Sequence, residues 1–140
     1  MARIHLFEFE DQKWFPSFLR NYGTDFLQFL SNKTKMYASI VPIIEKGLKA
    51  TGENKIVDLA SGGGGGFLWL NTELKKSVPD LRITLTDYYP NITAFKHTQS
   101  KAANFDYSEQ SVDARNVPEE LKGLRTQFLS LHHFKPEDAR

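Results

Sequence analysis

The stretch Lys55-Ile56-Val57-Asp58-Leu59-Ala60-Ser61-Gly62-Gly63-Gly64-Gly65-Gly66 decides the fold. A short apolar run meets five consecutive glycines, and Phe67, Leu70 and Leu74 then follow at helical spacing. Such a run is typical of a buried strand, and glycine permits the tight turn that leads from a strand into a helix. We therefore expect a strand, a glycine-rich loop and a helix, an order found in nucleotide-binding domains.

Alternating strands and helices are expected to continue after this loop. Leu81, Ile83 and Leu85 alternate with polar residues, which indicates a second strand. The pattern then predicts a strand end near Asp87, a helix over residues 90–103, a strand around residues 110–112 and a last strand over residues 126–131. This alternation predicts an α/β domain with a parallel, Rossmann-like sheet and helices on both faces.

A helical segment is expected before the loop. Six of the eleven phenylalanines lie in the first 30 residues, several at intervals of three or four, which predicts a helix from Phe15 to Leu30 with its aromatic face in the core. A second helix is expected from Met36 to Leu48, with Pro42 kinking or restarting it. The chain thus divides into a helical N-terminal segment, residues 1–50, and a partial Rossmann-like domain, residues 51–140.

Composition excludes several classes of function. The chain has 140 residues, and 18 Lys and Arg balance 17 Asp and Glu to a net charge of +1, which disfavours nucleic acid as a partner. The absence of cysteine excludes disulfides, zinc-thiolate sites and thiol catalysis. No apolar run approaches the roughly 20 residues that span a bilayer. We expect a soluble, cytoplasmic protein with no membrane partner and no metal site.

The last residues carry the signals of a helix start. Pro136 suits the first turn of a helix, and Glu137 and Asp138 suit its positive end. The chain stops there, with its fourth strand at a sheet edge. We expect a truncated copy of a longer domain that self-associates through this exposed edge; a C-terminal tail is the alternative.

The glycine loop lacks the residues that grip phosphate. A dinucleotide-binding G-x-G-x-x-G/A pattern would end on Phe67 or Leu68, and neither is small. The Gly-Lys-Ser/Thr of a P-loop is missing, and no basic residue lies between Ser61 and Glu73. Asp58 would repel a polyphosphate but suits a positively charged ligand. S-adenosylmethionine, with an ammonium, a sulfonium and no phosphate, fits this loop.

The motif from Asp58 to Gly64 resembles the first motif of the class I S-adenosylmethionine-dependent methyltransferases, an acid followed by alternating small residues. Ala60 departs from the glycine that the family more often has. The resemblance covers most of residues 37–140 and implies a class I methyltransferase fold that is incomplete after its fourth strand. It also implies S-adenosylmethionine as the cofactor.

The resemblance assigns roles to further residues. Asp87 occupies the place of the acid that holds both ribose hydroxyls, and Tyr88 beside it is a candidate to pack on adenine. The segment Ser111-Val112-Asp113-Ala114 resembles the third-strand motif, whose acid accepts from the adenine amino group while the next backbone N–H meets the ring. The expected cofactor-binding residues are Asp58, Ala60, Ser61, Gly62, Gly63, Gly64, Asp87, Tyr88, Asp113 and Ala114. The alternative for each acid is an ordinary structural role at a loop or strand end.

The segment from Leu129 to Phe134 resembles the fourth-strand motif of the same family, which implies a place beside the transferable methyl group. His132 and His133 are candidates to orient or deprotonate an acceptor, although strand-end histidines in a polar cleft are an equal reading. Adjacent side chains on a strand diverge, which rules out a two-ligand metal site from this pair.

The sequence predicts a methyltransferase that acts on an unidentified, small-molecule acceptor. The alternative is a non-catalytic fragment or binding module that retains the cofactor-loop sequence. A nicotinamide-dependent oxidoreductase would have the same alternation of strands and helices. It is disfavoured because Phe67 breaks the dinucleotide-binding glycine pattern and Asp58 would repel the pyrophosphate.

Overall fold

The computed structural model describes residues 14–135 and 137–138. The first part of the expected N-terminal segment, and part of the helix start expected over residues 135–140, lie outside the described residues. The described helices and strands are α1 (Ser17–Thr34), α2 (Val41–Thr51), β1 (Lys55–Leu59), α3 (Leu68–Leu74), β2 (Arg82–Leu85), α4 (Ile92–Lys101), β3 (Phe105–Tyr107) and β4 (Leu124–Gln127). Among these residues, no helix has the length and apolar character that a membrane crossing requires.

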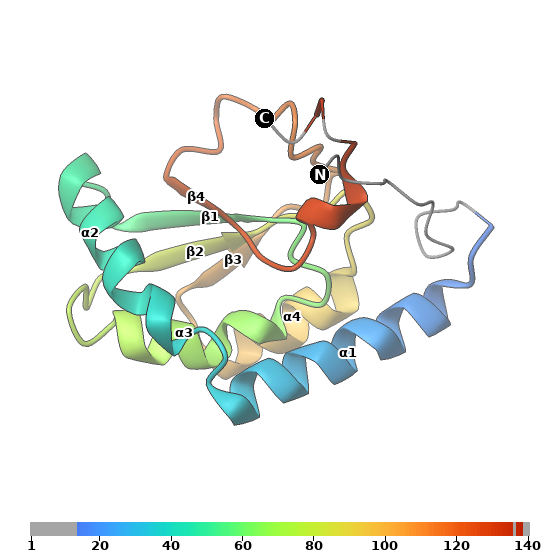
Figure 1. The fold of residues 1–140 in the computed structure, drawn as a ribbon, viewed down its shortest axis with the longest axis horizontal. Helices are drawn as coiled ribbons and strands as arrows, with labels where there is room; N and C mark the ends of the chain where they lie inside the picture. The colour runs from blue at the N-terminus through green and yellow to red at the C-terminus, as the bar shows by residue number, and fades with distance from the viewer. Residues whose placement is uncertain (1–13, 136, 139–140) are drawn as a thin grey trace, which may run out of the picture.

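The four strands form one parallel sheet in the order β3-β2-β1-β4 (Figure 1). Ile56 of β1 pairs with Ile83 of β2 on one side and with Leu124 of β4 on the other. The expected Rossmann-like α/β architecture is thus confirmed, and β4 lies at a sheet edge as predicted. Self-association through that edge stays a prediction.

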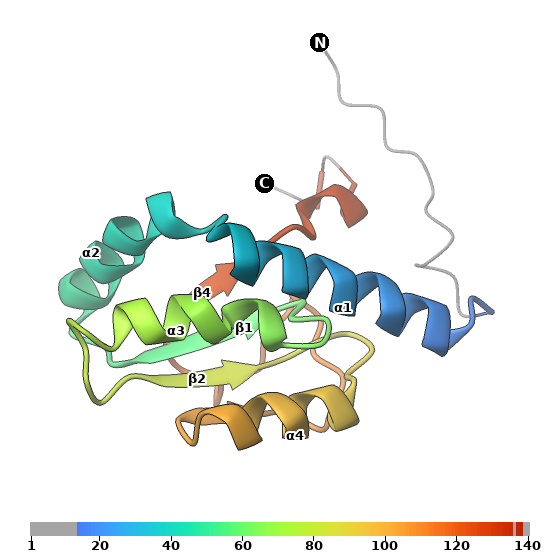
Figure 2. The same ribbon diagram turned by 90° about the horizontal axis from the view of Figure 1, so that it is seen from below.

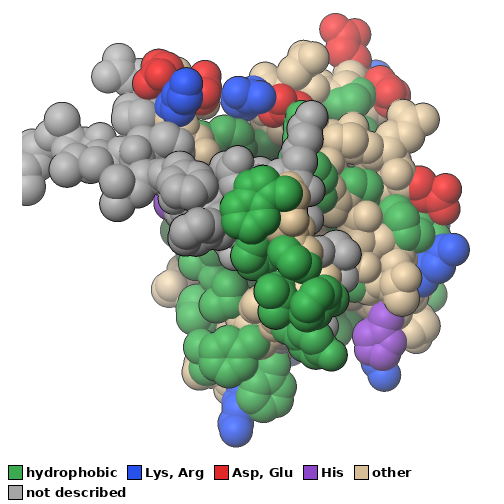
Figure 3. All heavy atoms as spheres, turned by 90° about the vertical axis from the view of Figure 1, so that its right-hand side faces the viewer, with side chains coloured by type: hydrophobic (Ala, Val, Ile, Leu, Met, Phe, Trp, Pro, Cys, Tyr) green, Lys and Arg blue, Asp and Glu red, His purple; other side chains and the backbone are tan. Residues whose placement is uncertain are grey.

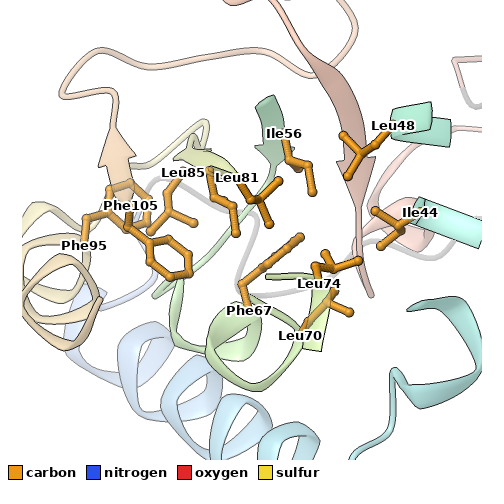
Figure 4. Packing of buried hydrophobic residues seen from close by; sticks show 11 residues of the cluster. Ile44, Leu48, Ile56, Phe67, Leu70, Leu74, Leu81, Leu85, Phe95 and Phe105 are labelled. Atoms are coloured by element: carbon orange, nitrogen blue, oxygen red, sulfur yellow. The ribbon is translucent and has the colours of Figure 1, made fainter. Parts of the chain in front are cut away.

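Helices cover one face of the sheet. Figure 1 shows α3, α4 and α1 below the strands, and Figure 2, seen from that side, shows α3 between α4 on one side and α1 and α2 on the other. The main core lies between these helices and the sheet, and Figure 4 shows its side chains pointing toward one another. It contains Ile44, Leu48, Ile56, Phe67, Leu70, Leu74, Leu81, Ile83, Leu85, Phe95 and Phe105. Because Ile44 and Leu48 belong to α2, the segment before residue 50 shares a core with the sheet.

The expectation of helices on both faces is wrong for the described residues. The opposite face of β1, with Val57 and Leu59, packs against Val112 and its neighbours in residues 108–123. This segment, which joins β3 to β4, forms turns and coil. An irregular connection therefore covers the face on which a helix was expected.

Two strands lie elsewhere than predicted. The third strand is Phe105–Tyr107, not residues 110–112, and the fourth is Leu124–Gln127, not residues 126–131. Leu129 adopts a left-handed φ of 53°, which ends the extended backbone before the predicted strand does. Gly123, with a φ of 147°, allows β4 to start close to β1, because a Cβ there would lie 2.7 Å from the Lys55 carbonyl oxygen.

The aromatic face of the first helix is not in the core. Phe18, Tyr22, Phe26 and Phe29 of α1 are exposed, contrary to the expectation from their spacing. The helix packs against the glycine turn and α3 with another side. By contrast, Pro42 restarts the second helix as anticipated, since a 3-10 turn at Ala38–Ile40 precedes α2.

Candidate ligand-binding site

A cavity of about 620 Å³ opens at the carboxyl ends of the strands. Ligands of open parallel sheets bind at this edge, outside the carboxyl ends of the strands. The glycine loop, the turn after β2, the segment after β3, the segment after β4 and the inner side of α1 contribute to its wall. It is lined by the predicted residues Asp58, Ala60, Ser61, Gly62, Gly64, Asp87, Tyr88, Asp113, Ala114, His132 and His133. Gly63 is the exception: it is buried, and its carbonyl oxygen accepts from Thr98 Oγ1 of α4 at 3.4 Å.

Asp58, near the end of β1, is a buried carboxyl group at the base of the cavity. Its Oδ1 accepts a hydrogen bond from Thr126 Oγ1 of β4 at 2.8 Å, and its Oδ2 accepts one from Ser61 Oγ at 2.7 Å. Burial raises the pKa of Asp58 to about 7; the two hydrogen bonds oppose this shift, and the nearby charge of Asp87 adds to it. Asp58 therefore changes charge near neutral pH.

Asp87, which follows β2, joins two backbone turns. Its Oδ2 accepts from the Gly62 N–H at 2.8 Å, and its Oδ1 accepts from the Tyr89 N–H at 2.8 Å. The carboxylate thus reaches across from the second strand to the first turn of the glycine loop. An ionised carboxylate has about four lone-pair sites, so a group of this kind can accept hydrogen bonds from a ligand's hydroxyl groups as well as from backbone N–H groups.

The glycine loop is fastened by its own backbone and by a side chain of α1. Ser61 N–H donates to the Thr86 carbonyl oxygen at 2.8 Å. Asn32 Nδ2 donates to the Gly65 carbonyl oxygen at 2.7 Å, and Asn32 Oδ1 accepts from the Trp69 N–H at 2.9 Å. Trp69 lies in the first turn of α3, so a side-chain amide already occupies an N–H that phosphate-binding loops direct at their ligand. Asn32 belongs to no motif that the sequence shows, and it was not predicted at the site.

Glycine is required at Gly64 by packing. Its φ is 74°, and a Cβ there would clash with the Leu85 side chain and approach Phe95. Ala60, where the methyltransferase motif more often has glycine, also adopts a left-handed φ, of 53°. The loop conformation at residue 60 is therefore one that suits glycine, although the residue is alanine.

The segment after β3 lines the cavity although it is not a strand. Val112 N–H donates to the Asp87 carbonyl oxygen at 2.9 Å, and Ser111 Oγ donates to the Tyr88 carbonyl oxygen at 2.7 Å. These bonds hold the segment beside the turn after β2. The motif Ser111 to Ala114 was thus wrongly expected on a strand, but it lies at the same edge of the sheet.

Asp113 is engaged by a cation that the sequence analysis did not single out. Arg115 Nε donates to Asp113 Oδ1 at 3.0 Å, and Nη2 donates to Oδ2 at 2.7 Å. Hydrogen bonding from the Arg115 side chain lowers the pKa of Asp113. Arg115 also lies 3.5 Å from Asp138 Oδ2. Two acids therefore share its charge at the cavity wall.

His132 and His133 lie on a 3-10 turn, Leu131–His133, and not on a strand. Their ring centroids are 4.1 Å apart, so the expected divergence of the two side chains is wrong. Both still line the cavity, as expected for the segment after the fourth strand. Within the described ranges, no group of three His, Cys, Asp or Glu side chains could hold a metal ion.

Aromatic rings form an apolar part of the wall. Phe128, just after β4, lies with its ring centroid 4.7 Å from that of Tyr37 and 5.5 Å from that of Phe67. Burial, and then the charge of Asp58, raises the pKa of Tyr37. Tyr88 and Tyr89 stack edge to face at 4.9 Å on another part of the wall. Tyr37 and Phe128 were part of predicted apolar patterns, which do not distinguish a core residue from one that also meets a cavity.

The charged side chains of the described wall lean acidic. They are Asp58, Asp87, Asp113, Asp138, Arg115 and Lys135. Because Arg115 is paired with two of the acids, the wall favours a ligand with positive charge over a polyphosphate.

Comparisons with models of known protein families, with curated proteins and with solved structures give no significant match.

Proposed function

We propose that this chain binds S-adenosylmethionine in the cavity and transfers its methyl group to a small-molecule acceptor. The observation that carries the proposal is the bridge from Asp87 to the Gly62 N–H at 2.8 Å, beside the second acid Asp58. It joins the ends of the first two strands around a loop without a cationic side chain. The strand order matches the first part of the doubly wound order 3-2-1-4-5-6. The class I methyltransferase type of sheet is part of this proposal.

The cavity residues fit the cofactor's chemistry at several points. A volume of about 620 Å³ lies within the range of small-molecule and cofactor sites. Asp87 would accept hydrogen bonds from the ribose hydroxyls, and Asp58 would lie near the methionine ammonium. Asp113 and the Ala114 N–H would meet adenine, with Arg115 keeping the Asp113 carboxylate ionised. Tyr88 supplies an aromatic surface beside them.

The protein's part in the reaction is mainly placement. The bound cofactor supplies a methyl group on a sulfonium, which is already a good leaving group. Holding the acceptor in line with that methyl can account for roughly 7–11 kcal/mol of the barrier. Where the acceptor is a neutral hydroxyl, His132 or His133 would take its proton, since both rings line the same cavity.

Calorimetric titration with S-adenosylhomocysteine, the unreactive product, tests the binding site. We expect the wild-type chain to bind and Asp87→Asn to bind at least tenfold more weakly, because hydrogen bonds to a charged acceptor contribute about 1.5–3 kcal/mol each. Asp106→Asn is the matched control, since Asp106 is exposed on β3 and pairs with Arg82 away from the cavity. A cooperatively folded wild type that does not bind, or an Asp87→Asn chain that binds as tightly, would contradict the proposal.

Methyl release separates the enzyme from the binding-module alternative. The wild-type chain is mixed with S-adenosylmethionine and a panel of small organic acceptors, and product formation is followed. Turnover of at least one acceptor is expected. Cofactor binding without turnover of any acceptor would favour a non-catalytic binding module.

A further inference from the structure

Helix α1 turns an aromatic surface away from the rest of the described molecule. Phe18, Tyr22, Phe26 and Phe29 follow at intervals of three and four residues, which places their side chains on one face of the helix. Each of these residues is between 59% and 71% exposed. Figure 3 shows hydrophobic side chains gathered on the side of the molecule where α1 begins. We call these four residues the aromatic stripe.

The aromatic residues of α1 do not lie on the side that meets the fold, which presents Leu27 and Ser31 to the cavity and Asn32 to the glycine turn. Ser31 is buried, and Asn32 binds the glycine turn through both its amide nitrogen and its amide oxygen. Surface helices normally do the opposite, with the apolar stripe against the core and the polar face in water. The aromatic stripe is therefore not what attaches α1 to this fold, and its burial requires another surface.

We propose that the aromatic stripe is the contact surface between two copies of this chain, with their α1 helices packed antiparallel about a two-fold axis. The spacing is self-complementary in that arrangement. Phe18 of one copy faces Phe29 of the second copy, while Tyr22 faces Phe26, because both pairs are centred close to residue 24. A two-fold interface requires this reciprocity: if residue i of the first copy contacts residue j of the second, residue j of the first copy also contacts residue i of the second.

The area of the stripe suits a dimer. Aromatic side chains bury about 150–250 Å² each, so four that are roughly 60% exposed present about 500 Å² per copy. Two copies then bury about 1,000 Å², the lower bound for a specific protein interface. Leu19, which is 46% exposed beside the stripe, adds to this area. A patch of about 500 Å² is also near the upper end of what monomeric proteins expose.

Charge favours the antiparallel orientation over the parallel one. Lys33 lies with its Nζ 5.4 Å from the centroid of the Phe29 ring, and Lys35 follows the end of the helix. A parallel pair of helices would bring these cations of the two copies together. An antiparallel pair separates them by most of the helix length, about 27 Å for 18 residues.

Sedimentation velocity over a series of protein concentrations tests the proposal without any ligand. The wild-type chain is expected to sediment as a dimer that dissociates on dilution, and Phe26→Glu as a monomer at every concentration. Ile43→Glu is the matched control and should remain dimeric, because Ile43 is 67% exposed on α2, outside the stripe. Cooperative unfolding of each variant verifies that it is folded. A monomeric wild type, or a Phe26→Glu chain that stays dimeric, would overturn the proposal.

Disulfide trapping tests the orientation, since the chain has no cysteine of its own. Mixing Phe18→Cys with Phe29→Cys chains should give a cross-linked pair under mild oxidation, while each variant alone cross-links at least tenfold less. A disulfide needs Cα atoms within about 7 Å, which the antiparallel arrangement provides only for the mixed pair. Efficient cross-linking of each variant with itself would indicate parallel helices.

A monomeric wild type whose stripe binds phosphatidylcholine vesicles would identify a lipid surface as the occupant instead.

Discussion

At the scale of single residues, the carboxyl group of Asp58 links folding to pH. Its pKa in the folded chain is about 7, whereas an unfolded aspartate titrates near 3.8. The folded state thus binds a proton that the unfolded state has already released over this interval. Stability from this group is complete below about pH 4 and is lost as the pH rises through 7. A difference of about three pKa units corresponds to about 4 kcal/mol at full ionisation.

Asp58→Asn should flatten the dependence of stability on pH. Asparagine is similar in size and stays neutral, and the hydroxyls of Ser61 and Thr126 can still bind its amide. We expect the variant to be more stable than the wild type at pH 8, by less at pH 6, and similar to it near pH 4. Urea unfolding at about pH 4, 6 and 8 measures this, with Asp106→Asn as the exposed control. Parallel profiles for wild type and Asp58→Asn would show that Asp58 does not titrate as described.

Ala60 is held in a left-handed conformation, with a φ of 53°. That conformation destabilises the folded state by about 1–2 kcal/mol when the residue has a Cβ. Glycine avoids this cost, but its greater freedom in the unfolded chain lowers the free energy of unfolding by about 0.4–1 kcal/mol. Ala60→Gly is therefore expected to raise the free energy of unfolding by about 0.5–1 kcal/mol. Ala38→Gly is the control: Ala38 is exposed, lies in a 3-10 turn and lacks a positive φ, so this change should lower stability. An equal loss in both variants would mean that residue 60 is unstrained.

At the scale of elements, one side chain joins α1 to the glycine loop. Asn32→Leu removes the hydrogen bonds that join Asn32 to the Gly65 carbonyl oxygen and the Trp69 N–H. We expect a loss of about 1–3 kcal/mol in the free energy of unfolding, together with weaker S-adenosylhomocysteine binding. Thr34→Val is the control, since Thr34 Oγ1 donates only to the Leu30 carbonyl of the same helix. Chemical denaturation measures the free energy of unfolding of the two variants, and calorimetry measures their affinity for S-adenosylhomocysteine. Equal changes in Asn32→Leu and Thr34→Val would contradict a link between α1 and the loop through Asn32.

The elements that could be predicted are those with strong local signals. The apolar run of β1, the alternation in β2 and the glycines between them identified the centre of the sheet. β3 is only three residues long, too short for its alternation to stand out. The fourth strand was predicted too far along the chain because the left-handed turn falls on Leu129, and leucine is not a residue type that indicates such a turn.

The exposed aromatic side of α1 could not be foreseen from periodicity. Regular spacing places Phe18, Tyr22 and Phe26 on one face of a helix, but it does not state whether that face meets the core, a cavity or another molecule. Orientation was decided by the contacts of Asn32 with Gly65 and Trp69, which join residues more than 30 positions apart. Such pairings depend on the path of the whole chain.

At the scale of the whole molecule, parallel topology explains why part of the cavity could be predicted. Residues at the carboxyl ends of parallel strands share one edge, so Asp58 and Asp87 were expected together. Arg115 and Phe128 were not singled out, because their positions depend on irregular segments that enter and leave the sheet. The positions of Asp58 and Asp87 therefore follow from strand order, while those of Arg115 and Phe128 follow from loops.

The connection over residues 108–123 serves two surfaces at once: Val112 covers the outer face of β1, and Asp113 to Arg115 face the cavity. No helical hydrogen-bond ladder stiffens it. One face of β1 is consequently covered by the same peptide that would border a bound molecule. A ligand bound in the cavity would therefore slow amide hydrogen exchange in β1 as well as in residues 108–123. Exchange rates in the sheet would then show whether the cavity is occupied.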